Sequence, residues 1–530
     1  MVTYRAPDVY IEEIPSFPPS VAEVGTAIPA FIGYTEKAVN AAAADLRLRP
    51  TKIYSLKEFE DYYGFPKAEE IRVDVETNAD GKPIAAGVKS PDVSFLLYYA
   101  VKMYFDNGGA QCYIVSVGDY SGGIDKAELL DGLAATGLED EPTLLVIPEA
   151  TRLGYADYKD VTGEMLGQCT LLHDRFAILD VWKGSEMDDA QVEAGASAKN
   201  VIQANREAWA GALEFGAAYY PFVRTTMNPF VRVDESNVKV SVKPSGGAGG
   251  AGSMGAASAA SGTGSAGATT GTSGTGGTGG TGGAGGTAAA GRTGGATSTT
   301  GKGGASGADG TADELGKLKS SKTAVYNFVK AKLKDQFLVM PPSGAVAGVY
   351  AATDAARGVW KAPANVALLG VLEPVVKIST AKQEDLNVDT TAGKSINAIR
   401  AFSGKGTLVW GARTLAGNDN EWRYISVRRL FNTVEESVKK STYWAVFEPN
   451  DANTWVKVRG MIENYLIDKW REGALAGATP KDAFFVKCGL GTTMSAQDIL
   501  EGRMNIEIGM AAVRPAEFLV LKFSHKLQTS

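Results

Sequence analysis

A long stretch near the middle of the chain consists almost entirely of glycine, serine, threonine and alanine. It covers residues 244–312, with Gly-Thr-Gly-Gly repeats near 274–286. A segment of this kind has almost no large apolar side chains to offset the entropy lost on ordering. We therefore expect a flexible, solvated loop, and for ~69 residues a random coil spans roughly 45 Å. Such a length is tolerable only on an exposed surface.

Strands and helices alternate on both sides of this stretch, so it is an insertion into one pattern rather than a boundary between independent domains. Strands alternating with helices indicate a largely parallel sheet covered on both faces. Apolar runs predict strands at residues 26–33, 112–117, 143–147, 176–181, 217–223, 337–340 and 406–411. Helical spacing predicts helices at residues 55–64, 91–107, 157–174, 200–215, 313–334 and 344–356.

The last third of the chain has a different pattern, typical of an α+β domain. A long amphipathic helix is predicted at 453–472, where apolar residues recur at helical spacing. A strand is expected at 423–430, leading into a helix at 431–447. Further strands are expected at 484–487, 505–510 and 517–523, with a short helix at 495–500.

Both ends of the chain carry strand signals. Residues 515–523 read Pro-Ala-Glu-Phe-Leu-Val-Leu-Lys-Phe, and Val9-Tyr10-Ile11 precede a proline-broken run near the other end. An unpaired strand edge is a template for another chain, so these strands can join copies of the chain into a lattice. The alternative is that both pair inside one fold, as most terminal strands do.

Composition and charge exclude several classes of protein. Of 530 residues, 44% are hydrophobic and 21% charged, as in an ordinary soluble protein, and the net charge of −7 argues against a general nucleic-acid binder. The three cysteines, Cys112, Cys169 and Cys488, lack metal-ligand spacing and are expected to be buried free thiols in a reducing compartment. There is no secretory signal and no apolar run of about 18 residues.

Catalytic motifs are poorly supported. His173 and His525 are the only histidines, which argues against a histidine-based metal site or triad. Gly393-Lys394-Ser395 resembles the end of a phosphate-binding loop, but Val388 stands where the first glycine is needed. We expect no catalytic residues, no cofactor and no metal site.

Several short segments of the chain together form a specific pattern. They are residues 4–14, 26–33, 59–64, 105–117, 357–365, 386–387, 396–397, 410–415, 422–430 and 515–521. In these segments the chain resembles the sheath proteins of contractile phage tails and of phage-tail-like extracellular injection systems. Each segment is weak alone, but their order and spacing are specific. One departure is Asp8, where the family usually has glycine.

The resemblance implies an α/β plus α+β fold: a subtilisin-like α/β middle region without a catalytic triad, a C-terminal α+β sheath domain, and extended terminal strand arms. The sequence lacks the His-Gly-Thr-His and Gly-Thr-Ser-Met-Ala segments of such proteases. The expected domains are an N-terminal arm (1–25), an N-terminal α/β region (26–142), the subtilisin-like domain (143–405, with the insertion at 244–312), a C-terminal core domain (406–514) and a C-terminal arm (515–530).

The resemblance also implies a structural role rather than an enzymatic one. Subunits of such sheaths polymerise as helical, hexameric rings around an inner tube protein, with baseplate and tail terminator proteins as further partners and no direct nucleic-acid contact or membrane insertion. Contraction to a lower-energy state drives the tube through a target envelope. The residues matching the family's strand exchange are Val9, Tyr10, Ile11, Phe518, Leu519, Val520, Leu521 and Phe523.

Assembly is expected in the bacterial cytoplasm, as part of a phage-like particle. The insertion favours an injection system, and the alternative within the family is the tail sheath of a contractile-tailed bacteriophage, with the same mechanism used for DNA ejection. Outside the family, a subtilisin-fold enzyme and a Gly/Thr-rich surface adhesin are the rival interpretations.

Overall fold

The computed structural model describes residues 21–40, 45–89, 92–194, 197–244 and 312–518. Its centre is a nine-stranded sheet in the order β15-β18-β17-β10-β7-β6-β1-β5-β2, and every pairing from β17 to β5 is parallel. The predicted parallel sheet is therefore confirmed. The strands are β1 (Pro29–Tyr34), β2 (Thr51–Ile53), β5 (Cys112–Gly118), β6 (Leu144–Val146), β7 (Phe176–Asp180), β10 (Gly216–Tyr220), β15 (Val366–Ala367), β17 (Ile396–Phe402) and β18 (Gly406–Val409).

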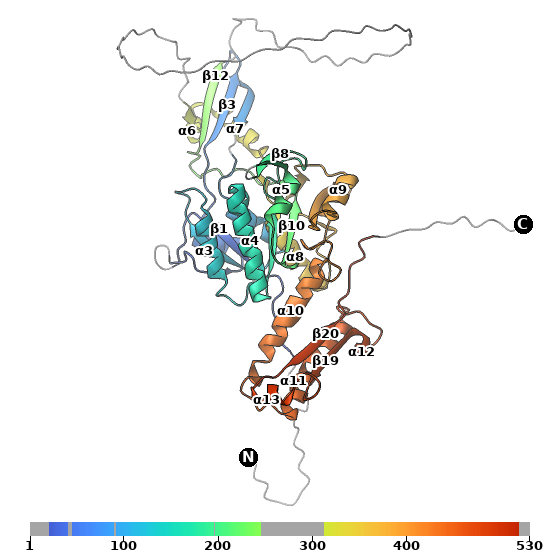
Figure 1. Cartoon of the computed structure of the whole chain (residues 1–530). Helices are drawn as coiled ribbons and strands as arrows, with labels where there is room; N and C mark the ends of the chain where they lie inside the picture. The colour runs from blue at the N-terminus through green and yellow to red at the C-terminus, as the bar shows by residue number, and fades with distance from the viewer. Residues whose placement is uncertain (1–20, 41–44, 90–91, 195–196, 245–311, 519–530) are drawn as a thin grey trace, which may run out of the picture.

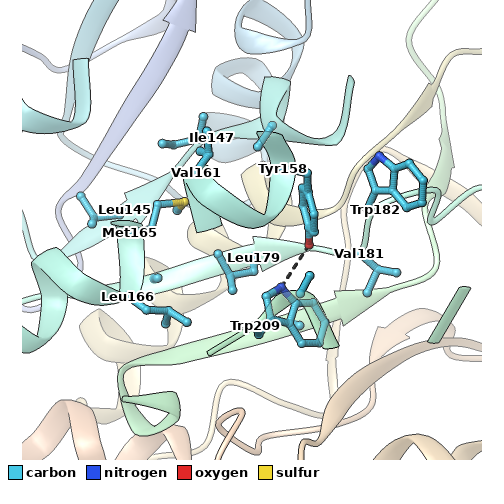
Figure 2. Packing of buried hydrophobic residues seen from close by; sticks show 14 of the residues in the cluster. Leu145, Ile147, Tyr158, Val161, Met165, Leu166, Leu179, Val181, Trp182 and Trp209 are labelled. Carbon is cyan, nitrogen blue, oxygen red and sulfur yellow. Dashed lines mark hydrogen bonds between the residues drawn. The ribbon is translucent and has the colours of Figure 1, made fainter. Parts of the chain in front are cut away.

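Helices cover both faces of this sheet, and together they form what we call the body. One face packs against α3 (Lys126–Thr136), α4 (Tyr155–Leu172) and α5 (Val201–Ala208). In the core of this face the Trp209 indole N–H donates to the Tyr158 hydroxyl at 3.1 Å (Figure 2). The other face packs against α1 (Leu56–Tyr63), α2 (Leu97–Asp106) and α8 (Ser343–Arg357).

Helices α2 and α8 approach each other closely because α8 presents glycines to its neighbour. A Cβ atom on Gly344 would lie 2.3 Å from the carbonyl oxygen of Ala100, and one on Gly348 would lie 2.5 Å from that of Tyr104. The small-residue helix predicted at 344–356 is thus confirmed, and its glycines are what permit the contact.

A smaller unit, the outer sheet, lies at the end of the body farthest from the C-terminal helices (Figure 1). Its order is β13-β12-β3-β4, and β3 and β12 pair in parallel although they are far apart in sequence. The helix predicted at 313–334 is two helices that meet at Lys322. The elements are β3 (Ile71–Thr77), β4 (Pro83–Lys89), β12 (Val238–Pro244), β13 (Asp313–Glu314), α6 (Leu315–Ser321) and α7 (Thr323–Lys334).

None of the strands of the outer sheet was predicted from the sequence. The signal was present in β3, where Ile71, Val73 and Val75 are buried and alternate with polar residues. The predicted insertion connects β12 to β13, and residues 245–311 lie outside the described residues.

The C-terminal residues form a third unit with its own apolar core, here called the C-terminal domain. Its two strands pair antiparallel, with Phe484 opposite Met510. The strands and helices predicted at 484–487, 505–510, 495–500 and 453–472 are confirmed within a residue or two. The elements are α10 (Ile425–Ser441), η3 (Tyr443–Ala445), α11 (Ala452–Arg471), α12 (Pro480–Ala483), β19 (Phe484–Cys488), α13 (Ala496–Leu500) and β20 (Ile506–Met510).

The strand predicted at 423–430 is wrong, because α10 begins at Ile425. The residues that α10 buries in the C-terminal domain are Leu430, Val434 and Val438, which recur every four positions and so share one helical face. The first turns of α10 lie in the body, where Arg429 pairs with Asp354 of α8 at 3.0 Å. Helix α10 thus connects the two units (Figure 1).

Two expected domain boundaries fall within the central sheet. Strand β6 follows residue 142 yet pairs with β1, and β18 follows residue 405 yet pairs with β17. The remaining elements are η1 (Pro148–Arg152), β8 (Gln191–Ala194), β9 (Ser197–Asn200), η2 (Leu213–Phe215), β11 (Val223–Thr225), β14 (Val339–Met340), β16 (Val371–Pro374) and α9 (Thr380–Asn387).

Candidate assembly surface

Of the residues predicted to exchange strands, only Phe518 lies in the described part of the chain. Its side chain is 72% exposed, and residues 515–518 are not in a strand. Val9, Tyr10, Ile11, Leu519, Val520, Leu521 and Phe523 lie outside the described residues. What the structure does place is the root of each arm.

The root of the N-terminal arm lies against the C-terminal domain. Val21 is buried in the core of that domain, and the backbone N–H groups of Ala22 and Val24 donate to the hydroxyls of Ser441 and Ser437 on α10. Between them, Glu23 accepts from the Lys469 ammonium of α11 at 2.8 Å. The chain is thus attached to two helices before it enters β1.

The root of the C-terminal arm is attached to the body through Glu517. Its carboxylate accepts from the Arg413 Nε and Nη2 atoms at 2.9 and 2.6 Å, from the Asn387 amide at 2.7 Å, and from the Tyr424 hydroxyl at 3.3 Å. Burial alone would raise the pKa of Glu517, but these donors outweigh it and the pKa lies below its ordinary value. We call these four residues the clasp.

Arg413 is itself held firmly. Its side chain is only 4% exposed, and its Nη1 atom donates to the carbonyl oxygens of Asn387 and Gly417. Its backbone N–H donates to the side chain of Asn397 in β17, which donates back to the Arg413 carbonyl at 2.8 Å. A strand of the central sheet therefore fixes the residue that holds the arm root.

The β19–β20 pair offers edges to which further strands could be added. Within the described residues, neither strand pairs with any other named strand. The clasp also opens onto a groove of about 680 Å³, lined in part by Trp410, Tyr424, Glu517 and Phe518. An unpaired edge and an arm root beside a groove are features expected of a strand-exchanging surface.

The body contains one buried serine–carboxylate pair. The Ser343 hydroxyl donates to Asp180 Oδ2 at 2.5 Å, and the Ser343 backbone N–H donates to Oδ1 at 2.8 Å. Burial raises the pKa of Asp180 to about 7, although the Ser343 donors act in the opposite direction. The serine starts α8 and the aspartate ends β7, so the pair caps a helix.

Among the residues that the structure describes, no histidine completes a triad at this pair. His173 caps the C-terminus of α4 and packs edge-on against Phe215, and His525 lies outside the described residues. A serine without a base to accept its proton is a poor nucleophile. The described part of the body therefore holds a structural pair rather than an assembled acyl-transfer site.

The Gly393-Lys394-Ser395 segment has a structural role as well. The Lys394 ammonium donates to the carbonyl oxygens of Arg206 and Trp209, and the Ser395 hydroxyl donates to that of Asn387. Burial lowers the pKa of Lys394. A lysine directed into its own fold is not available to a phosphate.

A second buried carboxyl, Glu149, caps α2. Its Oε1 atom accepts from the N–H groups of Leu96 and Leu97 at 3.1 and 2.7 Å, and its side chain is fully buried. Burial raises its pKa to about 7, although these hydrogen bonds act in the opposite direction.

All three cysteines are buried, as expected. In the described ranges no three metal-ligating side chains gather, and no helix has the length and apolar character to cross a membrane.

Similarity to known proteins extends along most of the chain. Residues 417–526 match the family model for the phage tail sheath C-terminal domain. The helical sheath of the anti-feeding prophage in its contracted state is 27% identical, with a TM-score of 0.57, and the alignment covers 99% of this chain and all of that one. The chain is therefore similar to contractile tail sheath proteins over nearly its whole length.

Two more sheath proteins are similar to the chain. The sheath complex of the PVC extracellular contractile injection system, also contracted, is 27% identical with a TM-score of 0.56 over 99% of both chains. The tail sheath protein of Vibrio phage KVP40 is 28% identical over 144 residues, which is 27% of this chain but only 21% of that protein's length. The chain has a mixed α/β fold that matches these contractile sheath structures.

Proposed function

We propose that this chain is the structural subunit of the contractile sheath of a phage-tail-like injection system. The similarity to the anti-feeding prophage sheath over 99% of this chain carries the proposal, because that protein was solved as a helical sheath in its contracted state. The tail sheath of a contractile-tailed phage is the second candidate, favoured by the match to the KVP40 protein.

In the proposed mechanism, copies of the chain assemble in hexameric rings around an inner tube protein, between a baseplate and a terminator protein. The N-terminal arm, through Val9–Ile11, and the C-terminal arm, through Phe518–Phe523, add strands to neighbouring subunits. The open β19–β20 edges support this exchange, since main-chain hydrogen bonds to an added strand fix its register. On contraction, the sheath passes from an extended, kinetically trapped state to a state of lower energy.

The proposal includes a subtilisin-like body that performs no proteolysis. The pairing of Ser343 with Asp180 at a helix cap, remote from any described histidine, supports this. The energy for motion is then stored in the assembled lattice and no cofactor takes part. Assembly would take place in the bacterial cytoplasm.

Electron microscopy of the purified full-length chain tests the proposed function. We expect helical tubes of sheath, and we expect them to be lost when Met1–Ser16 or Leu519–Ser530 are deleted, while the circular dichroism spectrum stays that of a folded chain. The matched control is deletion of 245–311, which removes more residues but no arm. Long sheaths from either arm truncation would contradict strand exchange.

A further inference from the structure

The two ends of the C-terminal domain meet at the clasp. Arg413 and Tyr424 come just before α10, the first helix of that domain, and Glu517 comes just after β20, its last strand. The ion pair between Arg413 and Glu517 joins positions 104 apart in the sequence. The domain is therefore attached to the body twice, once through α10 and once through the clasp.

The path of the chain shows where the domain ends and the body begins again. After β20, the backbone of Val513 still donates to Ala474 in the C-terminal domain at 3.1 Å. Within the described residues, the side-chain partners of Glu517, four positions later, all belong to the body. Phe518 is then largely exposed. Glu517 is thus the last residue of the described chain that is hydrogen-bonded to the body through its side chain.

The clasp is costly to open. Arg413 is nearly fully buried, so removing Glu517 would leave a charged guanidinium away from water without its carboxylate. The carboxylate is held by several donors at once, so a pull on the arm has to break these bonds together. Without the clasp, the same pull would first load the Val513–Ala474 hydrogen bond and would then open the β19–β20 ladder from Met510, one pair at a time.

We infer that the Arg413–Glu517 clasp is a force anchor: tension on the C-terminal arm enters the body at Glu517 and bypasses the C-terminal domain. This inference rests on the proposed function, in which a neighbouring subunit holds the residues beyond Phe518. Arg413, Asn387 and Tyr424 are positioning residues for that anchor. The C-terminal domain can then keep its fold while the lattice around it rearranges.

Single-molecule pulling tests the anchor directly. One handle is attached at the C-terminal Ser530 and the other at α4 through Lys159→Cys, an exposed position on the body. At constant force, Glu517→Gln is expected to shorten the lifetime before the first extension by about 10- to 100-fold, because it removes a charge-assisted bidentate pair. The matched control is Glu507→Gln, which breaks the exposed pair with Lys487 on the β19–β20 hairpin and leaves the clasp intact.

A second variant keeps the test decisive if Glu517→Gln fails to fold. Asn387→Ala removes one donor and leaves the ion pair, and we expect it to shorten the lifetime by about 3- to 10-fold. The anchor would be overturned if Asn387→Ala had the same lifetime as wild type and Glu507→Gln, and if Glu517→Gln, where it folds, did so too. The measurement uses one molecule at a time, so its result is independent of whether the wild-type chain forms sheaths.

Discussion

At the scale of single residues, two buried carboxyl groups each cap a helix on the same face of the sheet. Glu149 caps α2 and Asp180 caps α8, and the pKa of each is raised to about 7 by burial. An unfolded chain would titrate both nearer pH 4. At these two groups the folded state therefore binds more protons than the unfolded state between about pH 4 and pH 7, so their contribution to stability falls as the pH rises through that range.

Glu149→Gln should remove the share of this pH dependence that belongs to Glu149. The amide oxygen can still accept from Leu96 and Leu97, but the side chain no longer ionises. The free energy of unfolding of the variant, relative to wild type, should increase by about 3 kcal/mol from pH 4 to pH 8. Urea unfolding across that range measures it, and a difference independent of pH would contradict the assignment.

A second prediction at this scale concerns the contribution of the ion pair between Asp354 and Arg429 to stability. Both side chains are almost fully buried, and the guanidinium also lies over the Tyr350 ring. Asp354→Ala should lower the free energy of unfolding by about 3–5 kcal/mol, because it leaves a buried charge unpaired. Removing both partners as Asp354→Leu and Arg429→Met should cost less than the single change, as judged by urea unfolding; a larger loss would count against the argument.

At the scale of elements, the close contact of α2 and α8 reverses the effect on stability that replacing a helical glycine by alanine usually has. Gly348→Ala would normally favour a helix, but here the added methyl meets the Tyr104 carbonyl, so we expect destabilisation of about 1–3 kcal/mol. Gly167 in α4 has open space around it, and Gly167→Ala should stabilise by about 0.5–1 kcal/mol. Thermal unfolding compares the two, and shifts of the same sign would refute the packing argument.

How much of these elements the sequence predicts depends on how local the signal is. The strands at 112–117 and 176–181 were predicted correctly because a parallel strand that is buried on both faces consists of a continuous apolar run. The start of α10 was missed because the charged Arg429 is buried by a partner far away in the sequence: it pairs with Asp354, 75 positions earlier. Nothing within a window of ten residues indicates that pairing.

The candidate site divides in the same way. The arms were predicted from local strand signals, and Val9–Ile11 and most of 518–523 still lie outside the described residues. The clasp was not predicted, because an arginine and a glutamate 104 positions apart carry no mutual signal in one sequence. Only the fold, by returning the chain from β20 to the body, brings them together.

At the scale of the whole molecule, the units have separable roles. The outer sheet lies at one end, and the C-terminal domain with the root of the N-terminal arm lies at the other, while the root of the C-terminal arm is bound to the body between them (Figure 1). We expect that replacing residues 245–311 with a short turn leaves both the melting temperature and sheath length unchanged, because β12 and β13 already pair antiparallel beside the junction. Electron microscopy and thermal unfolding measure this. Loss of assembly would place the insertion in a subunit contact.

The neighbouring positions of β12 and β13 have a practical consequence. A guest protein whose own ends lie close together could be genetically spliced between them without stretching either strand. If the subunit polymerises as proposed, each copy would then display one guest at regular spacing along the particle. The outer sheet itself cannot be removed by deleting one short continuous segment, because β3 and β12, which pair in parallel, come from two distant parts of the chain.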